Sequence, residues 1–177
     1  FIRFVNQKNI NFNSTISTSI FETNPFLMRK NAPSLIEYSA FYGSIQIFKY
    51  LQLNGVDLQN SLWFYVIHGH YPELVHLLEE NKINPSKGII SESIKCHYDD
   101  MTNYIFNCVI DKESNEIVYS TCLQNRNYAF LHENDVSDNF AFYFFCKYDY
   151  VKPVRICLNS YKPDVNAIIV QNKYYYE

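Results

Sequence analysis

Apolar and polar positions along the chain form short apolar segments separated by polar corners. In the first clear example, Ile36 and Ala40 precede a corner, and Ile47, Tyr50 and Leu51 follow it. Apolar residues three and four apart, without sustained alternation, indicate helices rather than strands. The pattern therefore predicts an all-α fold built from helix pairs.

The corners recur at a nearly constant interval. They fall at Gly43, His70, His97 and Asp149, so the first two intervals are 27 residues and the third is 52, close to twice that. A fixed period is the signature of a repeat architecture. A degraded repeat is therefore predicted between the last two corners, with its first helix within Ser114 to Asn125.

One helix pair cannot bury its own apolar face, but a stack of pairs can. The predicted fold is therefore a solenoid of stacked antiparallel helix pairs. We expect residues 1–31 to hold the end of a preceding unit and an irregular connection, and residues 167–177 to begin a truncated further unit. The predicted repeats span 32–60, 61–87, 88–112, a degraded 113–137, and 138–166. We expect the chain to be a segment of a longer array.

Several residue types mark the predicted helix ends. Gly55 follows a helix as a C-terminal cap does, and Ser61 and Ser137 are candidate N-caps. Pro72 falls in a first turn, where its missing N–H costs little. In the degraded repeat, His132 to Asn139 carries little apolar content, so its second helix is expected to be short or irregular.

The first unit carries the clearest family resemblance. It reads Ser34 to Ala40, the pair Phe41-Tyr42, the corner Gly43-Ser44, then Gln46 to Leu51, and it closes with Asn54 to Leu58. In this order it resembles an ankyrin repeat, with an inner helix, a variable step, a corner, an outer helix and a finger. Such a resemblance implies an ankyrin-like solenoid.

A narrower resemblance covers roughly residues 31–170. The chain is similar to a divergent ankyrin family, a domain of unknown function expanded in trichomonad-type protists. The matching stretches are residues 33–46, 77–81, 94–97 and 146–150. Ankyrin arrays bind many unrelated partners, so the resemblance implies a fold more than a function.

The chain departs from the ankyrin pattern in three ways. Its 27-residue interval is shorter than the usual period of ~33 residues, so β-turn fingers are expected to be short or absent. The threonine-proline-leucine-histidine motif is poor in every unit, which weakens the usual ties between inner helices. Corners at His70, His97 and Asp149 lack the glycine that best tolerates a left-handed backbone.

The ankyrin resemblance also implies a binding surface. In such arrays the two residues before each corner face the concave groove where partners dock. Aromatic residues beside lysines suit a protein partner, because aromatics are enriched in interface hot spots. A structural interpretation stands beside it, in which Phe41 and Tyr42 fill the groove left by short fingers. The candidate partner-binding residues are Phe41, Tyr42, His68, Gly69, Lys95, Cys96, Lys147 and Tyr148.

Composition narrows the function classes. Of 177 residues, 47% are hydrophobic and 19% charged, which predicts a folded chain. The net charge of −3 lacks the basic excess of nucleic-acid binding, and no apolar run approaches the ~20 residues of a membrane-spanning helix. Five cysteines without a paired CxxC spacing predict reduced thiols and a cytoplasmic protein.

No cluster of residues predicts catalysis. His68, His70 and His76 lack a completing ligand, so they are interpreted as corner and surface histidines rather than a metal site. Neighbours such as Cys96 and His97 do not face each other on a helical turn, and the paired carboxylates are interpreted as solvated faces. We therefore predict no enzymatic activity, no metal and no cofactor.

The prediction is a non-catalytic protein–protein interaction or scaffold segment that uses the concave face. Two alternatives stay open: a structural component of a large cytoskeletal or flagellar assembly, and a regulatory repeat region of a larger multidomain protein. Contact on the concave groove would favour the first interpretation, and contact on the outer helices or end to end would favour a lattice.

Overall fold

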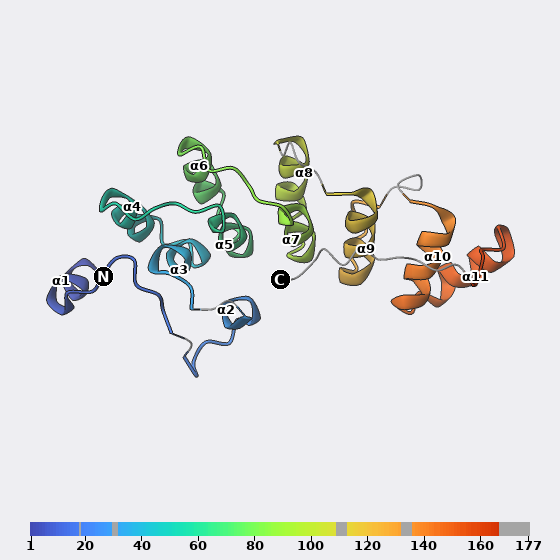
Figure 1. The fold of residues 1–177 in the computed structure, drawn as a ribbon, viewed down its shortest axis with the longest axis horizontal. Helices are drawn as coiled ribbons and strands as arrows, with labels where there is room; N and C mark the ends of the chain where they lie inside the picture. The colour runs from blue at the N-terminus through green and yellow to red at the C-terminus, as the bar shows by residue number, and fades with distance from the viewer. Residues whose placement is uncertain (18, 30–31, 109–112, 132–135, 167–177) are drawn as a thin grey trace. The chain divides into compact units, whose positions relative to one another are not determined.

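Short α-helices joined by tight turns make up a computed structural model of the chain, which describes residues 1–17, 19–29, 32–108, 113–131 and 136–166 (Figure 1). Within these ranges the regular elements are all helical, and the strand-like pairing is an isolated bridge between Thr15 and Ser34. The predicted all-α class is confirmed. The chain divides into two compact units, Phe1–Val109 and Ile110–Glu177.

Unit 1 contains two N-terminal helices and then three helix pairs. Within each pair the two helices contact each other, and α3 packs against α5 as α5 packs against α7. The first helices of the three pairs therefore lie in a row. The helices are α1 (Ile2–Lys8), α2 (Pro25–Arg29), α3 (Leu35–Phe41), α4 (Ile45–Leu53), α5 (Leu62–Gly69), α6 (Pro72–Glu80), α7 (Ile89–Lys95) and α8 (Asp99–Cys108).

Unit 2 contains α9 (Asn115–Asn125), α10 (Asp138–Lys147) and α11 (Val151–Ser160). Helix α10 packs against both others around a core that includes Leu123 and Phe144. Helix α9 lies where the first helix of the degraded repeat is predicted. The predicted irregular segment from His132 to Asn139 falls partly outside the described residues, and its end already belongs to α10, which begins at Asp138.

Each first helix ends at a left-handed residue. The corners adopt φ between +52° and +62°, and Arg126 supplies the corner that the sequence does not mark. At four of the five, the next N–H bonds back to the carbonyl five residues earlier, as in Tyr98 to Ser93 at 3.1 Å. This is the Schellman arrangement, which satisfies helix-end carbonyls. The five left-handed residues are Gly43, His70, His97, Arg126 and Asp149.

Burial differs between the two helices of a pair. Helix α5 buries five of its eight residues, whereas its partner α6 buries three of nine, Leu74, Val75 and Leu78. A first helix is flanked by its partner and by neighbouring first helices, so it is apolar on several sides. A second helix buries one stripe and keeps an amphipathic pattern.

The helix ends confirm most of the predicted caps. Gly55 has φ +82° after α4, Pro72 is the first residue of α6, and the Ser137 hydroxyl accepts from the Phe140 N–H at 3.4 Å. Ser61 lies at the predicted N-cap position of α5, but its side chain makes no cap bond. Its hydroxyl donates instead to Glu37 Oε1 at 2.8 Å.

The bond from Ser61 connects two repeats. Glu37 already accepts from the Ser34 N–H at 2.9 Å through Oε2, in a capping box that begins α3. Its other oxygen is therefore available to the residue preceding α5. This carboxylate ties the starts of two neighbouring first helices, α3 and α5.

Candidate functional site on the corner face

Six of the eight predicted site residues lie at the C-terminal ends of α3, α5 and α7. We call this surface the corner face. The packing of α3 on α5 and of α5 on α7 places the three helix ends side by side. The corner face consists of Phe41, Tyr42, His68, Gly69, Lys95 and Cys96. It belongs entirely to unit 1.

His68 connects the second repeat to the third. Its Nε2 lies 2.7 Å from Glu92 Oε1, and its Nδ1 lies 3.5 Å from Cys96 Sγ. A carboxylate only accepts hydrogen bonds, so Nε2 carries the hydrogen. In the neutral ring, Nδ1 then accepts from the Cys96 thiol. Lys95 Nζ completes the cluster by donating to Glu92 Oε2 at 3.0 Å.

Glu92 is the charged centre of this cluster. Burial alone would raise its pKa, but the hydrogen bond with His68 and the charge of Lys95 outweigh burial and lower the pKa to about 2. The carboxylate therefore stays ionised at neutral pH. A half-buried, ionised carboxylate with a bond on each oxygen fixes the orientation of the groups around it.

The same surroundings keep Cys96 protonated. Burial, followed by the negative charge of Glu92, raises the pKa of its thiol to about 12. A nucleophilic cysteine requires a lowered pKa, so this Cys–His–Glu geometry lacks the activation that nucleophilic catalysis needs. The thiol acts here as a hydrogen-bond donor that closes the contact between α5 and α7.

A segment ahead of the repeats lies on the corner face. We call residues 19–29 the arm; it includes α2. Phe26 of the arm stacks on His68 with ring centroids 3.8 Å apart, lies parallel to Phe41 at 6.0 Å, and meets the edge of Tyr65 at 5.1 Å. The neighbouring Leu27 is 2% exposed and anchors the helix.

Glu22 fixes the other end of the arm. Its Oε2 accepts from the hydroxyls of Tyr38 at 3.0 Å and Tyr42 at 3.2 Å, while Oε1 accepts from the Asn24 N–H at 2.9 Å. The bond from Asn24 is the largest cause that lowers the pKa of this carboxyl. Burial, and then bonding to Tyr42 and Glu22, raises the pKa of Tyr38. One oxygen of the Glu22 carboxylate thus accepts hydrogen bonds from both tyrosine hydroxyls.

Gly69 is required by close packing. A Cβ built on it would lie 2.6 Å from the carbonyl oxygen of Phe41, closer than real Cβ contacts come. Only glycine lets α5 approach α3 this closely. The role visible for Gly69 is therefore to bring Phe41 and His68 together.

Lys147 and Tyr148 occupy the corresponding positions in unit 2, at the end of α10. The Lys147 ammonium lies 5.2 Å from the Phe144 ring centroid and 5.5 Å from that of Tyr148, within cation–π range. Helix α10 thus holds this lysine over its own aromatic side chains.

Sequence reasoning missed Glu22, Phe26 and Glu92. A signal existed for Glu92, which stands three and four residues before Lys95 and Cys96 and so shares their helix face. No periodicity marks Glu22 or Phe26, because α2 has only five residues. The histidine that the structure brings to Cys96 is His68 of the neighbouring repeat, with Nδ1 3.5 Å from Sγ.

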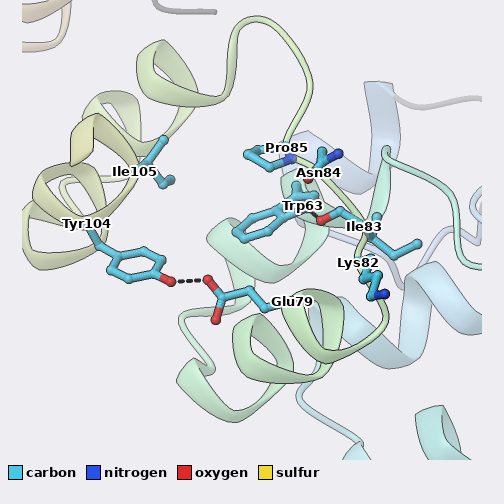
Figure 2. A pocket seen from close by; sticks show the side chains of 8 residues that line it. All are labelled: Trp63, Glu79, Lys82, Ile83, Asn84, Pro85, Tyr104 and Ile105. Atoms are coloured by element: carbon cyan, nitrogen blue, oxygen red, sulfur yellow. Dashed lines mark hydrogen bonds between the residues drawn. The ribbon is translucent and has the colours of Figure 1, made fainter. Parts of the chain in front are cut away.

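Unit 1 also has a hollow between α5, α6, α8 and the loop after α6 (Figure 2). It measures about 280 Å³. The Trp63 indole N–H donates to the Ile83 carbonyl at 2.8 Å, and the Tyr104 hydroxyl donates to Glu79. Trp63 thus bonds the loop after α6, and Tyr104 bonds α6 itself, within the lining of the hollow.

Two features are absent from the described part of the chain. No three His, Cys, Asp or Glu side chains there are grouped so that they could hold a metal ion. None of the helices in the described ranges combines the length and apolarity needed to span a bilayer. Comparison with known proteins finds no matching family model, curated protein or solved structure.

Proposed function

We propose that unit 1 is an ankyrin-like stack of helix pairs that binds a protein segment through the corner face. The carrying observation is the arm itself: a peptide segment lies on this face through ring stacking on His68 and two hydrogen bonds to Glu22. A surface that holds one peptide by such contacts has the chemistry to hold another. Aromatic and polar groups of this kind dominate interface energetics.

The ankyrin-like part of the proposal rests on the recurring corners. Left-handed residues end the first helices at intervals of 27, 27, 29 and 23 residues. The described residues lack fingers with strands, in keeping with the short period. The proposal carries no catalytic step. It keeps the expectation of a cytoplasmic protein, including a cytoskeletal or flagellar one.

Peptide display on the immobilised chain tests the proposal. Selected peptides should bind wild type and lose at least tenfold in affinity when Tyr42→Ala or Lys95→Ala alters the corner face. The matched control is His76→Ala, whose side chain on α6 is 71% exposed. Equal binding by all four proteins would place the interaction elsewhere and reject the proposal.

A structural role in a larger assembly is the second candidate, and α11 favours it. Val151 is 53% exposed and Leu158 44% exposed, and these two residues, seven apart, share one face of the helix. Large exposed apolar patches mark interaction surfaces. Light scattering tests the role: concentration-dependent self-association that Leu158→Lys abolishes would support it, and a monomer at all concentrations would not.

A further inference from the structure

We propose that the arm is an intramolecular competitor for the corner face, and that the face recognises a partner segment with an acidic residue four positions before an aromatic one. The proposal rests on the proposed function and names its ligand class and its regulation. Glu22 and Phe26 define the spacing, because they are the arm residues that the face contacts through a carboxylate and a ring.

The corner face and its neighbouring side chains contact the arm at two places, one at the Glu22 carboxylate and one at the Phe26 ring, and the chemistry of the two places differs. The hydroxyls of Tyr38 and Tyr42 converge on one carboxylate oxygen, at 3.0 and 3.2 Å. A carboxylate accepts both bonds, whereas an amide or hydroxyl ligand would lose the charge-assisted part. At the other half, Phe41, Tyr65 and His68 surround one aromatic ring. An aliphatic side chain would not reproduce these stacked and edge-on contacts.

The arm is held in cis by a short neck. Residues before and after it pair through the bridge of Thr15 with Ser34, the Ile16 N–H to Pro33 carbonyl bond at 2.7 Å, and the Leu35 N–H to Ser14 carbonyl bond at 3.1 Å. Both ends of the excursion are thus fixed to the body of unit 1. Exchange of the arm between two copies would require breaking this neck, so the geometry favours a heterologous peptide over arm swapping.

The arm competes with a separate ligand strongly because it is tethered to the same chain as the corner face. A short connection presents the arm to the face at an effective concentration on the order of millimolar. A ligand in trans must displace it, and its apparent affinity falls by the fraction of molecules whose face is vacant. The docked arm meanwhile leaves Ile20 92% and Phe21 86% exposed. These side chains contribute nothing to the docking of the arm, which makes Phe21 a matched control for Phe26.

The test uses a fluorescein-labelled peptide of residues 19–29 and the full chain. Anisotropy should show at least tenfold tighter binding to the Glu22→Ala/Phe26→Ala double variant than to wild type, because the variant arm lacks the carboxylate and ring contacts that hold it on the face. Phe21→Ala should bind the peptide as wild type does. A peptide carrying Phe26→Ala, or Glu22→Gln, should bind the double variant at least fivefold more weakly than the wild-type peptide.

The outcomes separate the two proposals. If peptides selected by display bind wild type and the double variant equally at the corner face, the competitor role is wrong and the proposed function stands. If selected peptides bind but the arm peptide does not, the ligand class is wrong. If nothing binds the corner face of either protein, both proposals fail. Circular dichroism verifies that the double variant is folded, and Glu22→Gln alone, with a smaller gain, serves if it is not.

Discussion

Phe26 of the arm stacks on His68 of α5 with ring centroids 3.8 Å apart and planes 22° from parallel. The two ring nitrogens of His68 bond Glu92 and Cys96 of the next repeat. One imidazole therefore joins the arm, the second repeat and the third. Several expectations about stability and reactivity follow from this junction and from the corners.

Removing the Phe26 ring should weaken unit 1. Phe26→Ala loses three ring contacts of about 0.5–1.5 kcal/mol each, so we expect the free energy of unfolding to fall by about 1.5–4.5 kcal/mol. Trp63, the single tryptophan, is buried in unit 1 and reports its unfolding in urea. Phe21→Ala should stay within about 0.5 kcal/mol of wild type. Equal losses for both would show that the stacking contributes nothing.

Glu92 should make stability depend on acidity. Its pKa in the folded chain is about 2, below the ordinary 4.5, so its contribution is complete above about pH 4.5 and is lost as the pH falls toward 2. Glu92→Gln should therefore cost about 1–3 kcal/mol at pH 7 and progressively less at pH 4 and pH 3. Urea unfolding followed by Trp63 fluorescence measures the gap, and a gap that stays constant with pH contradicts the assignment.

Gly69 should not tolerate alanine, although alanine is the better helix former by about 1 kcal/mol. The added methyl would meet the Phe41 carbonyl oxygen at 2.6 Å, so α3 and α5 must separate. We expect a loss of about 1–3 kcal/mol, in the range of overpacked cores. Gly55→Ala meets nothing within 4 Å and should lose only the left-handed strain of about 1–2 kcal/mol. A Gly69→Ala protein as stable as wild type would refute the close approach.

Cys96 should react slowly with alkylating reagents. Burial, aided by the Glu92 charge, raises its thiol pKa to about 12, and only the thiolate is a good nucleophile. Iodoacetamide at pH 8 should modify the exposed Cys146 first, as peptide mass spectrometry can show. Preferential labelling of Cys96 would mean an activated thiol and would reopen the catalytic interpretation.

The corners should accept glycine. Arg126 ends α9 with φ +56° and its side chain is exposed. Arg126→Gly removes left-handed strain and should raise the unfolding free energy of unit 2 by about 1 kcal/mol. Asn125→Gly, at the last residue of the helix, should lower it, because it loses the bond from the Asn125 side-chain amide to the Thr121 carbonyl at 2.8 Å as well as some helix propensity. Thermal unfolding by circular dichroism compares them, and a loss in both variants contradicts the corner assignment.

The repeating part of the fold could be predicted from sequence because burial imposes a helical period on each pair. Helix α9 lies within the stretch that the doubled interval reserves for it. The corner at Arg126 could not be found, because arginine carries no preference for a left-handed backbone. The position of Ser61 before α5 could be predicted, but not its partner, because a serine before a helix has the same sequence signal whether it bonds its own helix or Glu37.

The site could be predicted only in outline. The position of His68 before its corner follows from the repeat, but its bonds to Glu92 and Cys96 depend on the register between α5 and α7, which no local pattern encodes. The arm was missed for a similar reason. Five helical residues carry no measurable period, and Phe26 and Glu22 act through contacts many residues away along the chain.

Hydrogen–deuterium exchange of the full chain with a display-selected peptide tests the central claim most directly. Ligand on the corner face should slow amide exchange at the ends of α3, α5 and α7 and, by displacing the arm, speed it in residues 24–29, where the Met28 and Phe26 amides are now bonded. Slowed exchange on the outer helices, with the arm unchanged, would contradict the claim that this face binds protein ligands in competition with the arm.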